Sequence, residues 1–283
     1  MTEPFSSDVL TIERADHVAT LWLDRPEARN AMGQAFWNDL PVAMAELSAD
    51  RAVRVVVIAA RGPHFSAGLD LLDAMGGIIS GERDADGGHK ASMASRAAAA
   101  RNGIVRLQRS IGSVAECPKP VIAAVHGSCI GGGVDLIAAC DIRLASTDAV
   151  FSVRETKLAI VADLGSLQRL PKIIGAGHVA ELAYTGKNID ADRAERVGLV
   201  NHLAAGGADG VVTAALGLAT EIAANSPIAV QGTKAVLAAG DGQTVAEGLD
   251  YVATWNAAML ASDDLAEAMA AFMEKRQPDF HGR

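Results

Sequence analysis

Residues 120–133, PVIAAVHGSCIGGG, join an uninterrupted apolar run to a loop of small residues. A short run of this kind is typical of a strand buried on both faces, and residues 53–59 (VRVVVIA) have the same character. A helix is predicted to follow the glycines at 134–140, with further strands at 142–145 and 149–153. This recurrence of strand, small-residue loop and helix favours an α/β fold over an all-α or all-β fold.

The patterns on either side of this segment divide the chain into two parts. Alternating residues predict a β-hairpin at 9–24. Apolar residues at three- and four-residue spacing predict a helix at 34–47, which Pro41 weakens. A stretch of small residues predicts a surface loop at 76–90, followed by a helix at 91–109. Beyond residue 201 the strand signal fades, and helices are predicted at 210–224, 227–239, 244–261 and 263–276.

We therefore expect an α/β core at residues 1–203 and a helical C-terminal region at 204–283. The second region is rich in Ala, Leu, Val and Met. Helices of this composition are expected to pack on the core or on a neighbouring subunit rather than to fold alone.

Composition and charge exclude several classes of function. The chain has 283 residues, 50% of them hydrophobic, and a formal net charge of −9. An acidic chain repels a phosphate backbone, so nucleic acid is not an expected partner. The three cysteines form no CxxC pair, which argues against a disulfide framework or a zinc site. The first residues, MTEPFSSDVL, do not resemble a signal peptide, and no apolar run is long enough for a membrane span. We expect a cytoplasmic protein.

The glycines at 131–133 allow a close approach of the backbone and are followed by the first N–H groups of a helix. Such N–H groups suit a developing oxyanion or a phosphate. The alternative is a tight turn between strand and helix. Neither GxGxxG nor GxxxxGK[ST] occurs in the chain, so a dinucleotide fold and a phosphate-binding NTPase loop are not supported.

Three acidic residues follow in apolar surroundings. Asp135 lies in the first turn of the predicted helix, where it either stabilises the helix N-terminus or serves a site. Glu155 follows a strand. Asp163 lies between apolar neighbours and either caps a helix from Gly165 or is a buried acid with a raised pKa, as proton transfer requires. The seven histidines show no metal-ligand spacing, and no GxSxG motif indicates a serine hydrolase, so no metal is expected.

Several motifs, in order along the chain, resemble the enoyl-CoA hydratase/isomerase (crotonase) family. They are 23–31 (LDRPEARNA), 64–70 (HFSAGLD), 118–127 (PKPVIAAVHG), 131–136 (GGGVDL), 140–143 (CDIR) and 168–171 (QRLP). The resemblance implies a spiral of ββα units, a helical C-terminal region that forms trimers, and a hexamer made of two trimers. It also implies an acyl-CoA thioester as substrate and no cofactor, since coenzyme A belongs to the substrate.

The resemblance also implies an oxyanion hole. The backbone N–H groups of Leu69 and Gly132 would bind the thioester oxygen. The adjoining residues of the two motifs are expected to contribute to substrate binding: Gly68, Asp70, Leu71 and Gly133. Preformed donors at a developing oxyanion contribute roughly 3–4 kcal/mol each.

Typical hydratases of the family carry Glu at the positions of Asp135 and Glu155, and Gly at the position of Asp163. This chain departs from that pattern, and its 131–136 and 162–172 segments resemble the Δ3,5-Δ2,4-dienoyl-CoA isomerase subfamily. The resemblance implies that Asp163 removes a proton at C2, that Glu155 adds one at C6, and that Asp135 orients or tunes the pair. An enoyl-CoA hydratase and a non-catalytic CoA-binding member are the alternatives.

Overall fold

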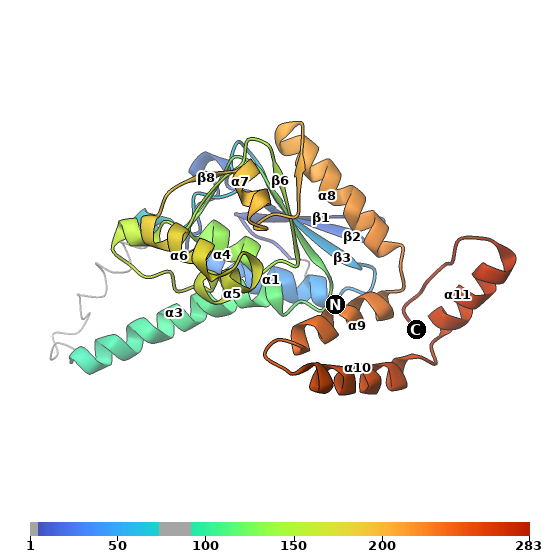
Figure 1. Cartoon of the computed structure of the whole chain (residues 1–283). Coiled ribbons are helices and arrows are strands. Elements are labelled where there is room, and N and C mark those ends of the chain that lie inside the picture. Colours follow the sequence, from blue (N-terminus) through green and yellow to red (C-terminus); the bar gives the residue numbers. More distant parts are fainter. Residues whose placement is uncertain (1–4, 74–91) are drawn as a thin grey trace.

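The computed structural model describes residues 5–73 and 92–283 (Figure 1). Its larger sheet has six strands in the order β1–β2–β3–β4–β6–β9. β1 and β2 form an antiparallel hairpin, and the other neighbouring pairs are parallel. The strands are β1 Leu10–Ala15, β2 Val18–Leu23, β3 Val55–Ala60, β4 Val121–Val125, β6 Ile142–Ser146 and β9 His202–Ala204.

A smaller sheet has three strands in the order β5–β7–β8. They are β5 Ser128–Ile130, β7 Val150–Ser152 and β8 Ile189–Asp190. β4 in the larger sheet is followed by β5 in the smaller sheet and then by α4 (Gly132–Ala138). β6 is followed in the same way by β7 and the short 3-10 helix η2 (Glu155–Leu158). This repetition of two strands and a helix confirms the predicted spiral of ββα units.

β3 shows why the apolar run at 53–59 is nearly continuous. All six of its residues are buried. Val56 and Ile58 belong to the core cluster that includes α1 (Gln34–Ala49), whereas Val55 and Val57 belong to the cluster on the other face of the sheet. α8 (Gly207–Ala223) covers that second face with Val211, Ala215, Ala219 and Ala223. A strand buried on both faces needs apolar side chains at consecutive positions.

Most predicted elements are present, with differences at short elements. The hairpin turns at Asp16 and His17, which both have positive φ, and α1 continues through Pro41. The helix expected at 91–109 is α3 (Met93–Ala115), which extends further, and the loop expected at 76–90 lies outside the described residues.

The sequence shows no strand signal beyond residue 201, yet β9 pairs with β6 just beyond it. Its three residues are too few to show a periodic pattern, and so are those of β5 and β8. The remaining helices of the predicted core are α5 Ser166–Ile173, α6 Ala176–Thr185 and α7 Ala191–Arg196, and a 3-10 helix, η1, covers Pro26–Ala28.

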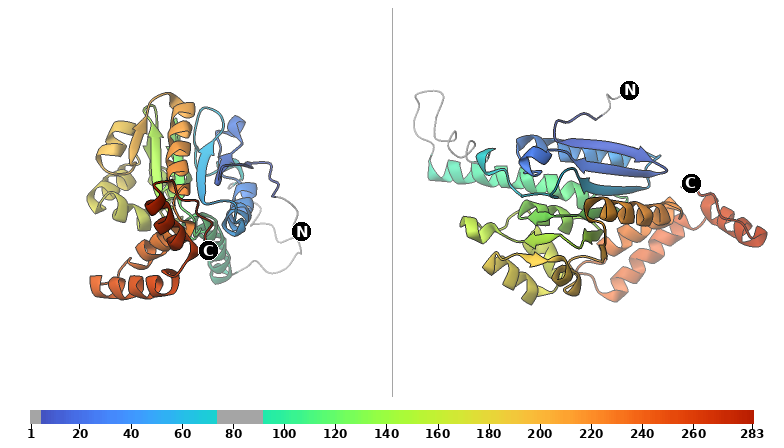
Figure 2. Two further views of the ribbon diagram at one scale, coloured as in Figure 1. Left: turned by 90° about the vertical axis from the view of Figure 1, so that its right-hand side faces the viewer. Right: turned by 90° about the horizontal axis from the view of Figure 1, so that it is seen from above.

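The C-terminal region is helical, as predicted. α8 lies against the larger sheet, while α9 (Pro227–Ala239), α10 (Val245–Met259) and α11 (Asp263–Glu274) lead away from it (Figure 1). Figure 2 shows α3 and α11 extending from the body in opposite directions. Within the described residues, no helix alone meets the length and hydropathy of a membrane span; α8 and α9 meet them only as a pair bent by 106°.

Candidate active site

Two backbone segments meet at the start of α4. Gly68 has a φ of +87°, and a Cβ built on it would lie 2.6 Å from the Ile130 carbonyl oxygen and 3.3 Å from the Gly132 nitrogen. A side chain at this position would be strained and would collide with backbone atoms. Glycine at 68 therefore permits direct backbone contact between the 64–70 segment and the glycine loop.

Met32 fixes the direction of the Leu69 N–H group. The Met32 N–H donates to the Gly68 carbonyl at 2.8 Å, and the Asp70 N–H donates to the Met32 carbonyl at 3.1 Å. In this parallel bridge the N–H of the intervening Leu69 points away from Met32.

The N–H groups of Leu69 and Gly132 form a pair of free donors. Neither donates to a protein acceptor within residues 5–73 and 92–283. A Cβ built on Gly132 would lie 3.8 Å from the Leu69 nitrogen, so the two amides border the same small space. Two donors in this arrangement can bind one oxyanion.

Asp135 is a buried carboxylate that links two helices. Its side chain comes from α4, the residue is only 1% exposed, and Oδ1 accepts a hydrogen bond of 2.6 Å from the backbone N–H of Ser166, the first residue of α5. Burial raises the pKa of Asp135 to about 6, the negative charge of Asp163 adds to this, and the Ser166 N–H and the Arg169 charge oppose it. Asp135 thus binds the N-terminus of a helix other than its own.

Glu155 places its carboxylate against the glycine loop. A Cβ built on Gly131, whose φ is +52°, would lie 3.2 Å from Glu155 Oε1. Oε2 is buried and has no hydrogen-bond partner among the described residues. Burial raises the pKa of Glu155, and the charges of Asp135 and Asp163 raise it further. A buried carboxylate oxygen without a partner is unusual in a purely structural role.

Asp163 lies on the exposed loop between η2 and α5. Of the two alternatives for Asp163, capping of the helix that begins after Gly165 is not observed: the first N–H of α5 donates to Asp135 instead. Desolvation by the surrounding loop raises the pKa of Asp163, and its charge influences the pKa of both other acids. The structure therefore brings the three predicted acids into one electrostatic neighbourhood.

The other residues expected at the site have mixed surroundings. Asp70 forms an ion pair of 2.8 Å with Arg25, which is the main reason that its pKa is lowered, and its Oδ1 accepts the N–H groups of Leu72 and Asp73. Leu71 is exposed, and Gly133 is buried where a Cβ would lie 3.4 Å from Cys129 Sγ. Their roles in binding stay predictions.

Several residues that hold the site were not predicted from the sequence. Met32 makes two backbone hydrogen bonds, Ser166 contributes its backbone N–H, and Gln108 contributes its side-chain amide. Arg169 was named only as part of the 168–171 motif. Single residues at these positions form no pattern, so no signal in one sequence could have found them. Among the residues with described positions, no group of three His, Cys, Asp or Glu side chains is arranged to hold a metal ion.

Comparison with known proteins shows the family of this chain. The family model described as enoyl-CoA hydratase/isomerase matches residues 13–283. The chain belongs to the enoyl-CoA hydratase/isomerase family. The structure of this family member is similar to that of a putative enoyl-CoA hydratase from Streptomyces coelicolor, with a TM-score of 0.88 and 33% identity over 100% of this chain and 97% of that one.

Curated relatives of this family member carry more specific names. The Δ(3,5)-Δ(2,4)-dienoyl-CoA isomerase of Dictyostelium discoideum is 45% identical over 273 residues, which cover 96% of this chain and 90% of the relative. The isomerase of the same name from Arabidopsis thaliana is 44% identical over 263 residues, which cover 92% and 91% of the two chains.

The same comparison corrects the expected location. The Dictyostelium relative is named mitochondrial and the Arabidopsis relative peroxisomal, so the expectation of a cytoplasmic protein is contradicted. That expectation came from the lack of a recognisable signal and membrane span, and such a lack does not specify a compartment.

Proposed function

We propose that the protein is a Δ3,5-Δ2,4-dienoyl-CoA isomerase of fatty acid metabolism. The observation that carries the proposal is the meeting of two free backbone N–H groups, at Leu69 and Gly132, with acids of raised pKa. The names of the curated relatives support the same activity. An acyl-CoA thioester is the substrate class of the family.

The paired N–H groups would bind the thioester oxygen. Removing a proton from C2 of a thioester produces an enolate, whose negative charge lies largely on that oxygen. Donors already fixed in position stabilise this charge without reorganising, and each contributes roughly 3–4 kcal/mol. Because both donors belong to the backbone, the main-chain positions of Gly68 and Met32 set the geometry of the two N–H groups.

Two acids would then move two protons. Asp163 takes the C2 proton, and the electron pair of the C2–H bond delocalises over the diene and the thioester. Glu155 gives a proton to C6, and the double bonds finish at C2 and C4. C2 and C6 are too far apart for one carboxylate to serve both easily, so a pair of acids with separate positions fits this reaction.

Asp135 is assigned to tuning rather than proton transfer. Its carboxylate is buried and already accepts the Ser166 N–H, while its charge raises the pKa of Glu155. The reaction shifts double bonds without net oxidation, so the proposal needs no cofactor beyond the coenzyme A of the substrate.

A substrate panel tests the function. Purified protein is mixed with a 3,5-dienoyl-CoA and, separately, with a 2-enoyl-CoA. Isomerisation extends conjugation to the thioester and changes the absorbance of the first substrate. The proposal predicts this change and little hydration of the second. Hydration alone would indicate the hydratase, and binding without turnover of either would indicate a non-catalytic member.

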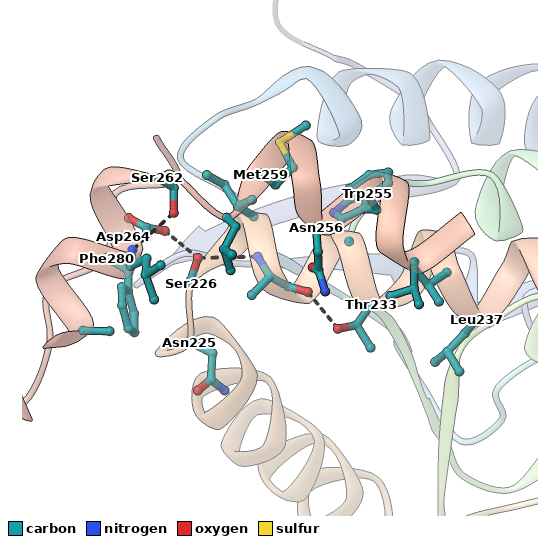
Figure 3. A pocket seen from close by; sticks show the side chains of 18 residues that line it. Asn225, Ser226, Thr233, Leu237, Trp255, Asn256, Met259, Ser262, Asp264 and Phe280 are labelled. Carbon is teal, nitrogen blue, oxygen red and sulfur yellow. Dashed lines mark hydrogen bonds between the residues drawn. The ribbon is translucent and has the colours of Figure 1, made fainter. Parts of the chain in front are cut away.

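The C-terminal helices support a trimer or hexamer. α9, α10 and α11 enclose a groove of about 630 Å³, and Trp255 on α10 lies against Gly232 on α9 (Figure 3). Exposed apolar side chains continue outside the groove on α10 and α11, among them Leu249, Met269, Phe272 and Met273. A soluble monomer rarely exposes so much apolar surface, and closed symmetry covers it. In this proposal residues 1–203 form the catalytic core, and residues 204–283 contribute to assembly.

A further inference from the structure

The loop that carries Asp163 is positioned through its backbone. The loop runs from Ala159, whose φ is +58°, to Gly165, whose φ is +124°. The Asp163 carboxylate forms no hydrogen bond with any residue whose position is described. The place of this carboxylate is therefore set by the main chain that bears it.

Side chains from three helices bind backbone groups in the C-terminal half of this loop and at the first residue of α5. Gln108 Nε2, on α3, donates to the Asp163 carbonyl at 2.7 Å. Arg169 Nη1, on α5, donates to the next carbonyl at 3.3 Å. Asp135, on α4, accepts the first N–H of α5 at 2.6 Å. The loop is thus held at Asp163 itself and at Leu164 and Ser166, which follow it.

Of these three side chains, only Gln108 binds Asp163 itself, and it carries no charge. It is exposed, and the turn of α3 that follows it is anchored in the core by Ile111 and Val114. The charge of Arg169 lowers the pKa of Asp135, so changing either residue would alter the electrostatics of the site. Gln108 can be replaced without changing the number of charges.

We infer that Gln108 is a positioning residue, which fixes the reach of the Asp163 carboxylate towards C2 of the substrate by holding the Asp163 carbonyl. This inference depends on the proposed isomerase function. Without the hydrogen bond the loop samples more positions, and fewer of them bring the carboxylate within reach of the C2 proton. A misplacement of about 1 Å can lower a catalytic rate by as much as about 100-fold.

Gln108→Met tests the inference, because methionine keeps the side-chain length and removes the donor. Asn102→Leu is the matched control, since it removes an amide from the same helix that has no hydrogen bond within the described residues. We expect Q108M to lower kcat by about tenfold with KM changed by less than about twofold. Its Tm should equal that of the wild type, and N102L should match the wild type throughout.

Two further readouts separate positioning from a general structural role. With substrate deuterated at C2, the kinetic isotope effect should rise in Q108M, because breaking the C2 bond becomes more rate-limiting. In an Asp163→Asn background, Q108M should cause no further loss, because it acts through Asp163. An unchanged kcat and isotope effect in Q108M, or the same loss with and without Asp163, would overturn the inference.

Hydrogen exchange tests the positioning role of Gln108 independently of the proposed function. A wild-type protein that does not convert the 3,5-diene would contradict the isomerase proposal itself. In either case, mass spectrometry should show faster exchange of the peptide covering residues 159–166 in Q108M and not in N102L. Equal exchange in Q108M and the wild type would overturn the positioning role.

Discussion

Asp135 Oδ1 accepts the backbone N–H of Ser166 at 2.6 Å, so an acid in the first turn of α4 binds the first residue of α5. This bond joins the helix that begins at the glycine loop to the helix that follows Asp163. It also explains why Asp163 has no capping function: the donor that Asp163 could have capped is already used by Asp135. In the proposed mechanism this leaves the Asp163 carboxylate available for the substrate.

The burial of Asp135 predicts a specific pH dependence of stability. Its pKa is about 6 in the folded chain against 3.8 for the ordinary carboxyl group, so between these pH values the folded state binds more protons than the unfolded state. Stability therefore falls as pH rises through this range, by on the order of 3 kcal/mol from this one group.

Asp135→Asn should remove that contribution, because the amide oxygen can still accept the Ser166 N–H and cannot titrate. We expect D135N to be more stable than the wild type at pH 8, with the difference vanishing near pH 4. Urea unfolding across this range provides the measurement. Parallel stability profiles of the two proteins would show that Asp135 is not a raised-pKa acid.

Asp163→Asn should lower isomerase turnover by at least about 100-fold, the usual scale for losing a positioned base. Stability should change little, because Asp163 is exposed and its carboxylate makes no hydrogen bond with the described residues. In the wild type, the raised pKa of Asp163 predicts that activity increases with pH as this base deprotonates. Near-normal turnover in D163N would contradict the assignment.

Gly132→Val and Leu69→Ala should differ in their effects. A side chain at Gly132 enters the space beside the Leu69 nitrogen, where the thioester oxygen would bind, and its closest contact is the flexible end of Met32 at 3.0 Å. We expect G132V to stay folded and lose activity. L69A keeps its N–H group, so it should keep a substantial part of the activity despite losing apolar contacts. Turnover, CoA-ester affinity and Tm are measured for both.

The result for G132V also decides between two interpretations of the glycine loop. A folded and active G132V would exclude the oxyanion role. An unfolded G132V would favour the tight turn, and Gly68→Ala supplies the comparison. G68A must displace the Ile130 carbonyl, so we expect it to lose stability and activity together.

The exposed apolar surface of α10 and α11 predicts at least three subunits per particle. Light scattering at micromolar concentration measures this directly. Phe272→Asp, on the exposed part of α11, should weaken assembly while leaving the fold of the core unchanged. A particle of 29.2 kDa for the wild type would contradict the proposed assembly.

The larger elements could be predicted from sequence because their burial pattern is local. β3 is buried on both faces and α1 on one, and each leaves a run or a stripe of apolar residues. β5, β8 and β9 have two or three residues each and left no such signal. Pro41 suggested a weakened helix, yet α1 continues through it because its apolar face is packed in the core.

The acids of the site could be named from motifs, but their surroundings could not. Nothing local indicates that Asp135 binds Ser166, which lies 31 positions away, or that Gln108 reaches Asp163, 55 positions away. These contacts exist only because α3, α4 and α5 pack together. The cellular location was predicted wrongly for a different reason, since the lack of a recognisable signal or membrane span does not specify a compartment.

The fate of the C2 proton tests the two-acid mechanism most directly. A 3,5-dienoyl-CoA deuterated at C2 is converted in ordinary water, and the product is analysed for deuterium at C6. If Asp163 takes the C2 deuteron and Glu155 supplies a different proton, the product carries no deuterium at C6. Deuterium transferred from C2 to C6 would show that one group moves the proton along the chain and would contradict the account.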